Sequence, residues 1–451
     1  MRLVQFNTLD HYGGAAGMAT SLHHFFKERG AASTLIVGTK LGADAATIEL
    51  GAAVRQAVAN QPLLGRSVTQ SVIAALCLRR RLEAAMGRED LGAPESRFLD
   101  TLLLDNPDLI LCHNLHGGYF DLRSLPALAR RHPVVLLLHD PWLLAGHCAH
   151  SFDCERWTDG CGTCPYPGLQ YALRRDSSHG NWLRKKRIYE SCRLYVVTPS
   201  HWLMDRVERS MLKPAVVAGQ VINNGVDQRV FHPGNRETAR RELGIDTAEQ
   251  VVLFAANGIR ESVWKDYATM RGAVAEAARM ADRPIRFLAV GEDAPPEQVG
   301  TATITFVPYR SAAELACYYQ AADLYLHGAR AENFPTTILE ALSCGLAVVA
   351  TAVGGIPEQI RGLQHDGDES GLNRYARNSA TGILTPMGDR AALSRAIGLL
   401  LNEPDLRRQM SASAVRDARQ RFSLEGMGQR YFDFFTDILH RKKDSQVPHG
   451  R

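Results

Sequence analysis

Short, uninterrupted apolar runs alternate along the chain with longer segments in which apolar residues recur every third or fourth position. Such runs are typical of strands buried on both faces, and the longer periodicity is typical of amphipathic helices. Their alternation predicts a parallel sheet covered by helices on both sides. In the first half the expected strands are Leu3–Phe6, Ser33–Val37, Leu109–Cys112, Val134–Leu138 and Leu194–Val197.

The same alternation starts again in the second half of the chain. Between the two runs, Val221–Gly234 contains Asn-Gly and His-Pro-Gly, which favour turns and loops. The pattern therefore predicts an α/β protein of two Rossmann-like, doubly wound parallel-sheet domains that face a cleft. The strands expected in the second half are Val251–Ala255, Ile285–Val290, Thr303–Val307, Leu324–Leu326 and Leu346–Ala350.

The expected domain boundaries follow from these runs. The first domain covers residues 1–225, and the second covers residues 226–440. A mostly helical insertion is expected at about 42–100, where the alternation of strands and helices lapses. Residues 441–451 are polar and are expected to form a tail.

Composition and charge narrow the class of protein. With 451 residues, 45% hydrophobic and 22% charged, the chain is typical of a soluble protein of two domains. A net charge of +4 does not indicate binding to nucleic acid. Basic clusters at Arg79–Arg81 and Arg184–Arg187 are either solvated helix faces or a surface for anionic lipid or phosphate. Because apolar runs long enough for a membrane span or a signal peptide are lacking, we expect the protein in the cytoplasm.

A glycine-rich turn follows the first expected strand. Gly13 and Gly14 stand there, and such a turn lets backbone N–H groups approach a diphosphate. The alternative is a tight turn that only needs glycine's conformational freedom. The spacing is not that of a dinucleotide fingerprint, and the second strand ends near Lys40 with no acid for a ribose. A nicotinamide dehydrogenase is therefore not expected.

Two bases and two acids follow strand ends in the second half. Arg260 and Lys265, five residues apart, could hold a pair of phosphates or be ordinary exposed bases. In ENFPTTILEALSCG, which begins at Glu332, Pro335 suits the start of a helix over Thr336–Ser343, and Gly345 marks its end. That helix would carry Glu340 about one turn in. Alternatively, Glu332 is only a helix-dipole partner and Glu340 lies on a solvated face.

The start of this expected helix offers backbone donors to a phosphate. The first N–H groups of a helix have no partner within the helix and favour an anion. The residues concerned are Asn333, Phe334 and Thr336.

These motifs together resemble the E-x7-E region of retaining glycosyltransferases of family four. Ala347–Thr351 and Gly354–Glu358, which follow the glutamates, add to the resemblance, which covers most of the chain. It implies the GT-B fold, in which two Rossmann-like domains hold a sugar nucleotide mainly through the C-terminal one. Where the family often has Pro-Ser before this region, the chain has His327-Gly328.

The resemblance also implies roles for individual residues. Arg260 and Lys265 would hold the donor diphosphate, Glu340 would bind the ribose, and Glu332 would lie beside the transferred sugar. In the first half, a histidine at the position of His113 would lie near the donor sugar; the alternative is a structural histidine at a strand end. Asp140, at the end of the next strand, is a candidate to orient the acceptor hydroxyl.

Residues 147–165 form a cysteine-rich loop with four cysteines. Two of them have the C-x2-C spacing of a zinc knuckle, so a structural zinc site is expected. Reduced thiols without a ligand and disulfides are the alternatives, and a cytoplasmic protein makes disulfides the least favoured. The loop resembles one in glycosyltransferases of the colanic-acid exopolysaccharide type. The candidate ligands are Cys148, Cys154, Cys161 and Cys164.

The whole sequence thus predicts a retaining glycosyltransferase. It would move a hexose from a UDP- or GDP-sugar to a hydroxyl of a lipid-linked or growing exopolysaccharide, with no cofactor in catalysis. The enzyme would be cytoplasmic and in peripheral contact with the anionic inner face of the membrane. The alternatives are a GT-B sugar-nucleotide epimerase or hydrolase, and an inactive subunit that only binds a sugar nucleotide.

Overall fold

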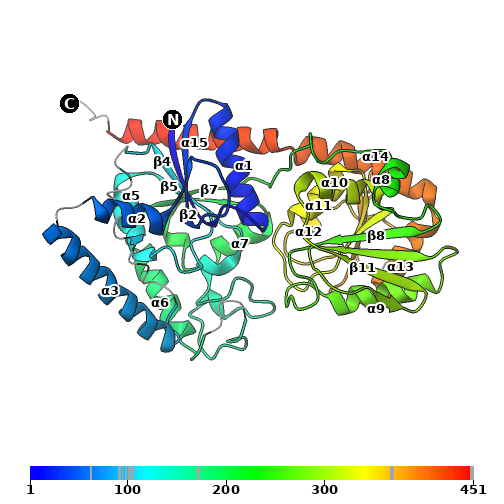
Figure 1. Cartoon of the computed structure of the whole chain (residues 1–451), viewed down its shortest axis with the longest axis horizontal. Helices are drawn as coiled ribbons and strands as arrows, with labels where there is room; N and C mark the ends of the chain where they lie inside the picture. Colours follow the sequence, from blue (N-terminus) through cyan, green and yellow to red (C-terminus); the bar gives the residue numbers. More distant parts are fainter. Residues whose placement is uncertain are drawn as a thin grey trace. The chain divides into compact units, whose positions relative to one another are not determined.

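The structure is a computed structural model that describes residues 1–60, 63–89, 93, 95–96, 99, 103, 106–169, 173–365 and 370–446. The chain divides into two compact units (Figure 1). The first contains residues 1–222 together with the C-terminal residues from 428, and the second contains residues 223–427. Each unit is built around its own seven-stranded sheet.

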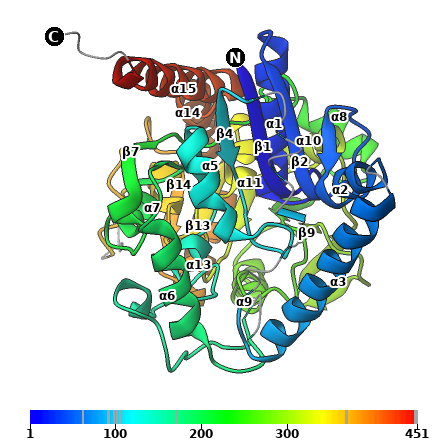
Figure 2. The same cartoon turned by 90° about the vertical axis from the view of Figure 1, so that its left-hand side faces the viewer.

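The sheet of the first unit is parallel throughout, in the order β3-β2-β1-β4-β5-β6-β7. Figure 2 shows β1, β2, β4 and β7 of this sheet together with α1, α5 and α7. The strands are β1 Arg2–Leu9, β2 Ala32–Thr39, β3 Thr47–Glu49, β4 Leu109–Cys112, β5 Val134–Leu137, β6 Leu194–Thr198 and β7 Val216–Val221.

Helices connect these strands. The α-helices are α1 Gly14–Glu28, α2 Leu50–Ala59, α3 Leu63–Ala85, α5 Leu125–Arg131, α6 Ser178–Tyr189, α7 His201–Glu208 and α15 Leu424–Gln446. The short 3-10 helices are η2 Leu122–Ser124, η3 Pro141–Leu144, η4 Arg156–Thr158 and η5 Lys213–Ala215. In both views α3 runs along the edge of the first unit, away from the sheet (Figures 1 and 2).

The sheet of the second unit has the order β10-β11-β9-β8-β12-β13-β14. All neighbouring pairs are parallel except β10 and β11, which form an antiparallel edge. The strands are β8 Gln250–Ala255, β9 Ile285–Val290, β10 Glu297–Val299, β11 Ala302–Val307, β12 Leu324–His327, β13 Ala347–Thr351 and β14 Gly382–Thr385. The helices are α8 Arg236–Glu242, α9 Tyr267–Ala278, α10 Ala312–Ala321, α11 Thr336–Ser343, α12 Ile356–Gln359, α13 Arg390–Asn402 and α14 Pro404–Arg421.

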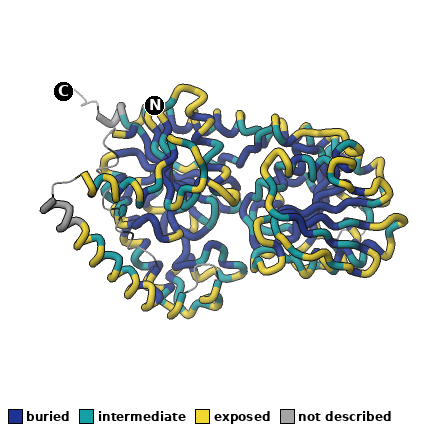
Figure 3. Tube along the Cα trace, viewed as in Figure 1, coloured by how far each residue is buried: buried dark blue, intermediate teal, exposed yellow. Residues whose placement is uncertain are grey.

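The strands carry the core of each unit. Every residue of β5, β8 and β13 is buried, and both sheets are dark blue in Figure 3. Helices cover both faces of a parallel sheet, so uninterrupted apolar runs are the sequence signature of such strands. The prediction of two parallel-sheet α/β units is confirmed.

The C-terminal helix corrects the predicted second domain. Residues 428–440 belong to the first unit, because α15 packs on α1 there. The rings of Phe26 and Phe435 stack with their centroids 5.5 Å apart. Gly428 permits this approach, since a Cβ at that position would lie 2.5 Å from the ring of Phe25. The predicted polar tail is also too long, because α15 continues to Gln446; residues 447–451 lie outside the described part.

The predicted insertion at 42–100 is only partly helical. It contains α2 and α3, but it also supplies β3, which pairs with β2 from Leu35 opposite Thr47. β3 was missed because a three-residue edge strand has no apolar run to mark it. Several residues between 90 and 105 lie outside the described part. None of the helices that the structure describes combines the length and the apolar character that a membrane span needs.

Candidate functional site

The two glutamates of the E-x7-E segment lie on either side of the start of α11. The helix runs from Thr336 to Ser343, as predicted from Pro335 before it and Gly345 after it. Glu332 is therefore in the loop that follows β12, and Glu340 is inside the helix. This loop extends beyond the carboxyl end of a parallel strand, where ligands bind in open α/β sheets.

The loop around Glu332 is fixed by the glycine pair that follows β13. Gly354 has a φ of 57°, and a Cβ there would lie 1.7 Å from the carbonyl oxygen of Glu332. Only glycine fits this close approach of two backbones. The next residue, Gly355, donates its N–H to the carbonyl of Asn333 at 2.8 Å. The segment after β13 thus sets the position of the first glutamate.

A second loop brings Lys265 to the same place. The N–H of Arg330 donates to the carbonyl of Trp264 at 2.8 Å, and Lys265 forms an isolated antiparallel bridge with Ala329. The ammonium of Lys265 forms an ion pair with the carboxylate of Glu332. The side chains expose only 16% and 19% of their surface, so solvent screens the pair weakly. The structure therefore brings together two of the predicted site residues.

His327, at the end of β12, is a third member of this group that the sequence argument did not assign to the site. Its Nε2 lies 3.7 Å from the Oε2 of Glu332, and its Nδ1 lies 3.3 Å from the hydroxyl of Tyr325. Burial, together with the ammonium of Lys265, lowers the pKa of His327 to about 4, so the ring is neutral at pH 7. Its place at a strand end is the sequence signal that could have found it.

The charge state of Glu332 is set by these neighbours. Burial alone would raise the pKa of this carboxyl. The ammonium of Lys265 and the ring of His327 outweigh burial and hold the pKa of Glu332 well below its ordinary value. Glu332 is therefore an ionised hydrogen-bond acceptor at neutral pH, and the alternative of a helix-dipole partner alone does not account for its partly buried ion pair.

Glu340 is in the opposite electrostatic situation. Its Oε2 accepts a hydrogen bond of 2.9 Å from the hydroxyl of Tyr319, a side chain that is completely buried. Burial raises the pKa of Glu340 to about 7, against the lowering effect of hydrogen bonds from Tyr319 and Thr336. Glu340 is half-buried and bonded to a buried tyrosine, which the alternative of a solvated helix face does not account for. Tyr319, on α10, was missed because nothing in the local sequence links it to α11.

Arg260 has an acidic partner of its own. Its Nε donates to the Oε1 of Glu292 at 2.5 Å, and its guanidinium lies 5.0 Å above the ring of Phe306. The other oxygen of Glu292 accepts the N–H groups of Ile259 and Arg260 at 2.7 and 2.9 Å. Glu292 was not among the predicted residues. Each of the two predicted phosphate-binding residues thus has its own carboxylate partner: Arg260 pairs with Glu292, and Lys265 pairs with Glu332.

The predicted backbone donors before α11 differ from one another. The N–H of Asn333 donates to the Oε1 of Glu332 at 3.2 Å, so it already has an acceptor. Phe334 is buried, with its ring centroid 6.0 Å from that of Phe422, and its carbonyl accepts from Asn224 at 3.2 Å. Thr336 is the first residue of the helix and is half-buried. Their role in binding a phosphate stays a prediction.

The glycine-rich turn of the first unit leads into α1, which begins at Gly14. Gly13 is the residue before the helix and has a φ of 86°. A Cβ added to Gly13 or Gly14 would meet no atom within 4 Å. The turn therefore combines a backbone that requires glycine with open space beside the first N–H groups of α1. Its part in binding a diphosphate stays a prediction.

His113 is buried within the first unit and is tied to two polar side chains. Its Nε2 lies 3.0 Å from the Oε1 of Gln5, and its Nδ1 lies 3.0 Å from the Nε2 of His139. Because an amide oxygen only accepts, His113 donates from Nε2 and accepts at Nδ1. Burial and the neighbouring His139 lower the pKa of His113, and burial lowers that of His139 to about 4. Both ring nitrogens of His113 are engaged, which favours the structural reading over direct contact with a sugar.

Asp140 is also engaged within the first unit. Its Oδ1 accepts the N–H of Trp142 at 2.8 Å and so caps η3, while its Oδ2 lies 3.0 Å from the Nε2 of His116. Burial would raise the pKa of Asp140, but His116 and these hydrogen bonds lower it overall. Asp140 is thus an ionised carboxylate beside His116. Its predicted contact with an acceptor hydroxyl stays a prediction.

Residues 235–417 match the family described as Glycosyl transferases group 1. The matched segment contains the Lys265–Glu332 ion pair and Glu340. This part of the chain is a group 1 glycosyl transferase domain. The sequence resemblance to glycosyltransferases is confirmed to that extent.

Relatives of the chain carry glycosyltransferase names. A D-inositol 3-phosphate glycosyltransferase from Segniliparus rotundus is 37% identical over 162 residues, which are 32% of this chain and 35% of the relative. The chain therefore spans about a third of the length of that relative. A putative colanic acid biosynthesis glycosyl transferase, WcaC of Escherichia coli K12, is 24% identical over 371 residues, covering 78% of this chain and 83% of the relative.

Solved structures show the same fold. A sucrose-phosphate synthase from Thermosynechococcus elongatus superposes with a TM-score of 0.62 at 15% identity, covering 98% of this chain and 99% of the other. HepE of Anabaena, in complex with UDP-glucose, superposes with a TM-score of 0.60 at 17% identity, covering 97% and 100%. The chain has the GT-B fold that the resemblance implied.

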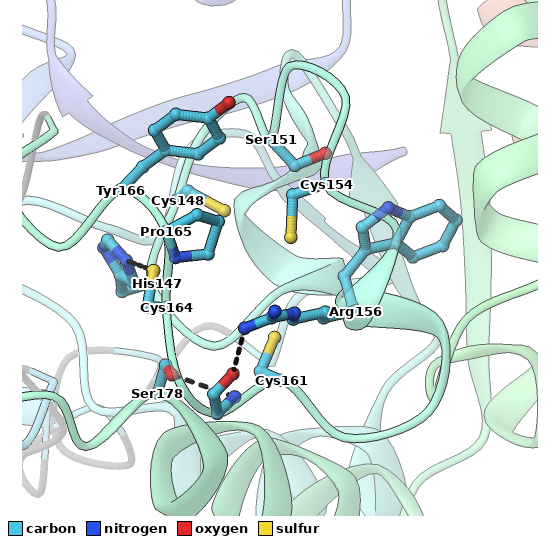
Figure 4. A pocket seen from close by; sticks show the side chains of 12 residues that line it. His147, Cys148, Ser151, Cys154, Arg156, Cys161, Cys164, Pro165, Tyr166 and Ser178 are labelled. Carbon is cyan, nitrogen blue, oxygen red and sulfur yellow. Dashed lines mark hydrogen bonds between the residues drawn. The ribbon is translucent and has the colours of Figure 1, made fainter.

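Outside the group 1 domain, the four cysteines of the 147–165 loop line one pocket of the first unit (Figure 4). All are unbonded thiols, and the Sγ of Cys164 lies 3.2 Å from the Nε2 of His147. Burial raises the pKa of Cys148 to about 12 and that of Cys161 to about 11, so both are protonated at neutral pH. Among the described side chains, no three of His, Cys, Asp or Glu stand together as metal ligands. The predicted zinc site therefore has no preformed ligand group here and stays a prediction.

Proposed function

We propose that the chain transfers a hexose from a nucleoside-diphosphate sugar to a hydroxyl of a lipid-linked or growing exopolysaccharide, with retention of the anomeric configuration. The observation that carries this proposal is the partly buried ion pair between Lys265 and Glu332 in the loops before α11, with Glu340 inside that helix. Both glutamates lie in the group 1 domain. The retaining chemistry rests on the resemblance of this segment to the E-x7-E region.

The charges of the site suit a sugar nucleotide. The ammonium of Lys265 can balance the diphosphate that leaves as the sugar is transferred. The ionised carboxylate of Glu332 can accept a hydroxyl of the transferred sugar, and Glu340 can accept the ribose hydroxyls once it is ionised. In this scheme the donor phosphate takes the proton of the acceptor hydroxyl on the same face of the sugar. No metal or other cofactor takes part in the reaction that we propose.

The relatives support the choice of donor and acceptor. HepE is described in complex with UDP-glucose, and WcaC is named for colanic acid biosynthesis. By analogy with HepE, we propose a UDP-hexose as the donor of this chain, with a GDP-hexose as the other candidate. By analogy with WcaC, we propose an exopolysaccharide as the acceptor. We place the enzyme in the cytoplasm, at the inner face of the membrane where a lipid-linked acceptor would be found.

A donor panel followed by product analysis tests the proposal. UDP, GDP and ADP are first compared by thermal shift, and the sugar nucleotides of the best base are then incubated with glycan acceptors. Transfer that keeps the anomeric configuration, read by NMR of the product, supports the proposal. Turnover of the donor without an acceptor would favour an epimerase or hydrolase, and tight binding without any turnover would favour an inactive subunit.

A further inference from the structure

The two basic clusters of the first unit, which are about a hundred residues apart in the sequence, meet at one pocket. It has a volume of about 280 Å³ and is open to solvent. Its walls come from the C-terminal half of α3, the turn after α3, η2 and α6. The lining residues are Arg79, Glu83, Arg88, Arg123, Arg184, Arg187 and Ile188.

The residues that the structure describes neutralise only part of the positive charge of this pocket. Arg79 pairs with Glu83 at 3.1 Å, and Arg123 pairs with Asp121, which does not line the pocket, at 2.6 Å. Within the described part of the chain, neither Arg88 nor Arg187 forms an ion pair, and both are exposed. Among the described lining residues, Glu83 is the one carboxylate, so the described part of the pocket holds an excess of guanidinium groups.

The pKa of Arg184 is lowered by its surroundings in the pocket. Burial lowers the pKa of Arg184 first, and the neighbouring guanidinium groups of Arg88 and Arg123 lower it further, against the effect of Glu83 and Glu89. Like charges that are held close together without enough counter-charge are stabilised by an anion. Guanidinium forks match the oxygens of a phosphate in geometry as well as in charge.

Hydrogen bonds and an ion pair connect the turn after α3 to α6, so the fold holds the arginines of the two elements close together. After α3, the carbonyl of Gly87 accepts from Asn181 of α6 at 3.3 Å, and the N–H of Glu89 donates to Asn181 at 2.9 Å. The carboxylate of Glu89 pairs with the ammonium of Lys185 at 2.8 Å, and Lys185 is completely buried. Gly87 has a φ of 72°, and a Cβ there would lie 1.9 Å from a backbone oxygen of Arg175.

The same lysine connects the pocket wall to the candidate acceptor residues. The ammonium of Lys185 donates to the carbonyls of Trp142 and Ala145 at 2.8 and 2.9 Å. These residues lie in and just after η3, which Asp140 caps. α6 therefore carries arginines that line the pocket and a lysine that holds η3.

α3 also carries exposed leucines. Leu78 and Leu82, one turn apart and next in sequence to Arg79 and Glu83, expose 60% and 58% of their surface. Exposed leucines beside arginines on one helix are typical of a segment that meets the interface of an anionic membrane.

We propose that this arginine pocket binds a phosphate group, carried by a lipid headgroup or by a soluble phosphate or diphosphate. The ligand's oxygens would accept from Arg88, Arg184 and Arg187, and the leucines of α3 would meet the chain of a lipid. The proposal does not depend on the transfer activity. Its test is therefore a binding test, which can fail or succeed independently of any glycosyl transfer.

The test compares two variants of the full chain with the wild type. Arg88→Gln combined with Arg187→Gln removes two exposed guanidinium groups of the pocket that form no ion pair with the described residues. Arg81→Gln is the matched control, because Arg81 is an exposed arginine of α3 that does not line the pocket. All three proteins should keep their unfolding temperature, since the substituted side chains are exposed.

Inorganic pyrophosphate is the soluble probe, titrated by calorimetry at fixed ionic strength. We expect binding to the double variant to be at least about tenfold weaker than to the wild type, because each lost charge-assisted hydrogen bond contributes about that factor or more. The control should bind within about twofold of the wild type. A parallel titration of Lys265→Ala measures how much of the pyrophosphate binds near Glu332 and not in the arginine pocket. The double variant leaves Lys265 and Glu332 unchanged.

Vesicles of phosphatidylcholine, with and without phosphatidylglycerol, distinguish the source of the phosphate. Loss of co-sedimentation with the anionic vesicles in the double variant alone assigns the pocket to a lipid headgroup. Weaker pyrophosphate binding with unchanged sedimentation assigns it to a soluble phosphate. The proposal is overturned if the double variant matches the wild type in both measurements, or if Arg81→Gln loses as much binding as the double variant.

Discussion

Lys265 and Glu332 form an ion pair in which neither side chain exposes as much as a fifth of its surface. They are 67 residues apart in the sequence, in the loops that follow β8 and β12. Those two strands are neighbours in the sheet, so their carboxyl ends open at the same edge. The topology of the second unit therefore brings the two side chains together, and it places an ionised carboxylate and an ammonium where we propose that a sugar nucleotide binds.

The raised pKa of Glu340 predicts a pH-dependent stability. Below the ordinary value of 4.5, this carboxyl is protonated in the folded and the unfolded chain. As the pH rises from 4.5 to about 7, the unfolded chain releases the proton and the folded chain retains it, so stability is lost over that range. Glu340→Gln keeps an acceptor for Tyr319 but cannot ionise.

We therefore expect Glu340→Gln to be more stable than the wild type at pH 8, by on the order of 2 kcal/mol, and equal to it at pH 4.5. Urea unfolding at both pH values measures the difference. Glu237→Gln, at an exposed position of α8, is the control and should show no such divergence. An equal stability of Glu340→Gln and the wild type at both pH values would show that Glu340 is not held protonated by burial.

The hydrogen bond between Gln5 and His113 predicts a cost for removing the amide. Gln5 donates from Nε2 to Ser33 at 3.1 Å and accepts from His113 at Oε1, all in the buried interior. Gln5→Leu would leave the Nε2–H of His113 buried without an acceptor. We expect the free energy of unfolding to fall by about 1–3 kcal/mol, as measured in urea. Gln56→Leu, at an exposed position of α2, should change it little, and a loss below about 0.5 kcal/mol for Gln5→Leu would contradict the account.

The four cysteines predict a measurable metal content if they bind zinc. We expect about one equivalent of zinc after gentle purification, and less than about 0.2 equivalents would end this interpretation. Cys161→Ser removes one of the predicted ligands and should release the metal, while Cys317→Ser, on α10 in the second unit, should not. Burial raises the pKa of Cys148 and Cys161, so both thiols are protonated at neutral pH. Zinc would have to displace these protons when it binds, and this lowers its affinity.

The proposed transfer predicts an insensitivity to chelators. Because Lys265 supplies a positive charge beside Glu332, we expect turnover to continue when EDTA is added to the assay. The measurement compares initial rates with and without EDTA after brief exposure, so that any structural zinc is retained. A loss of activity that Mg²⁺ or Mn²⁺ specifically restores would show that the diphosphate is balanced by a metal ion instead.

The sequence was sufficient for the parts of the structure that depend on neighbouring residues. The bounds of α11 were predicted correctly because Pro335 favours a helix start and Gly345 favours a helix end. The apolar strands were predicted because a strand that is buried on both faces has apolar residues at successive positions. The GT-B fold followed from the same strands and from the resemblance.

What the sequence could not show were the partners that come from distant segments. Glu292 for Arg260 and Tyr319 for Glu340 depend on which strands and helices are neighbours, and a single sequence does not give that order. The pairing of Gln5 with His113 depends in the same way on β1 lying beside β4. The C-terminal helix was misplaced because its place in the sequence suggested the second domain, while its contacts are with α1.

The measurement that tests the central claim most directly is the transfer rate of Glu332→Gln with the donor found by the nucleotide panel. The substitution keeps the size of the side chain and removes its charge. Glu261→Gln, at an exposed position of the loop that follows β8, is the control. We expect kcat/KM to fall by about a hundredfold or more, with the unfolding temperature within a few degrees of the wild type and the control unchanged. Turnover of Glu332→Gln at the wild-type rate would contradict the assignment of the Lys265–Glu332 pair to the active site.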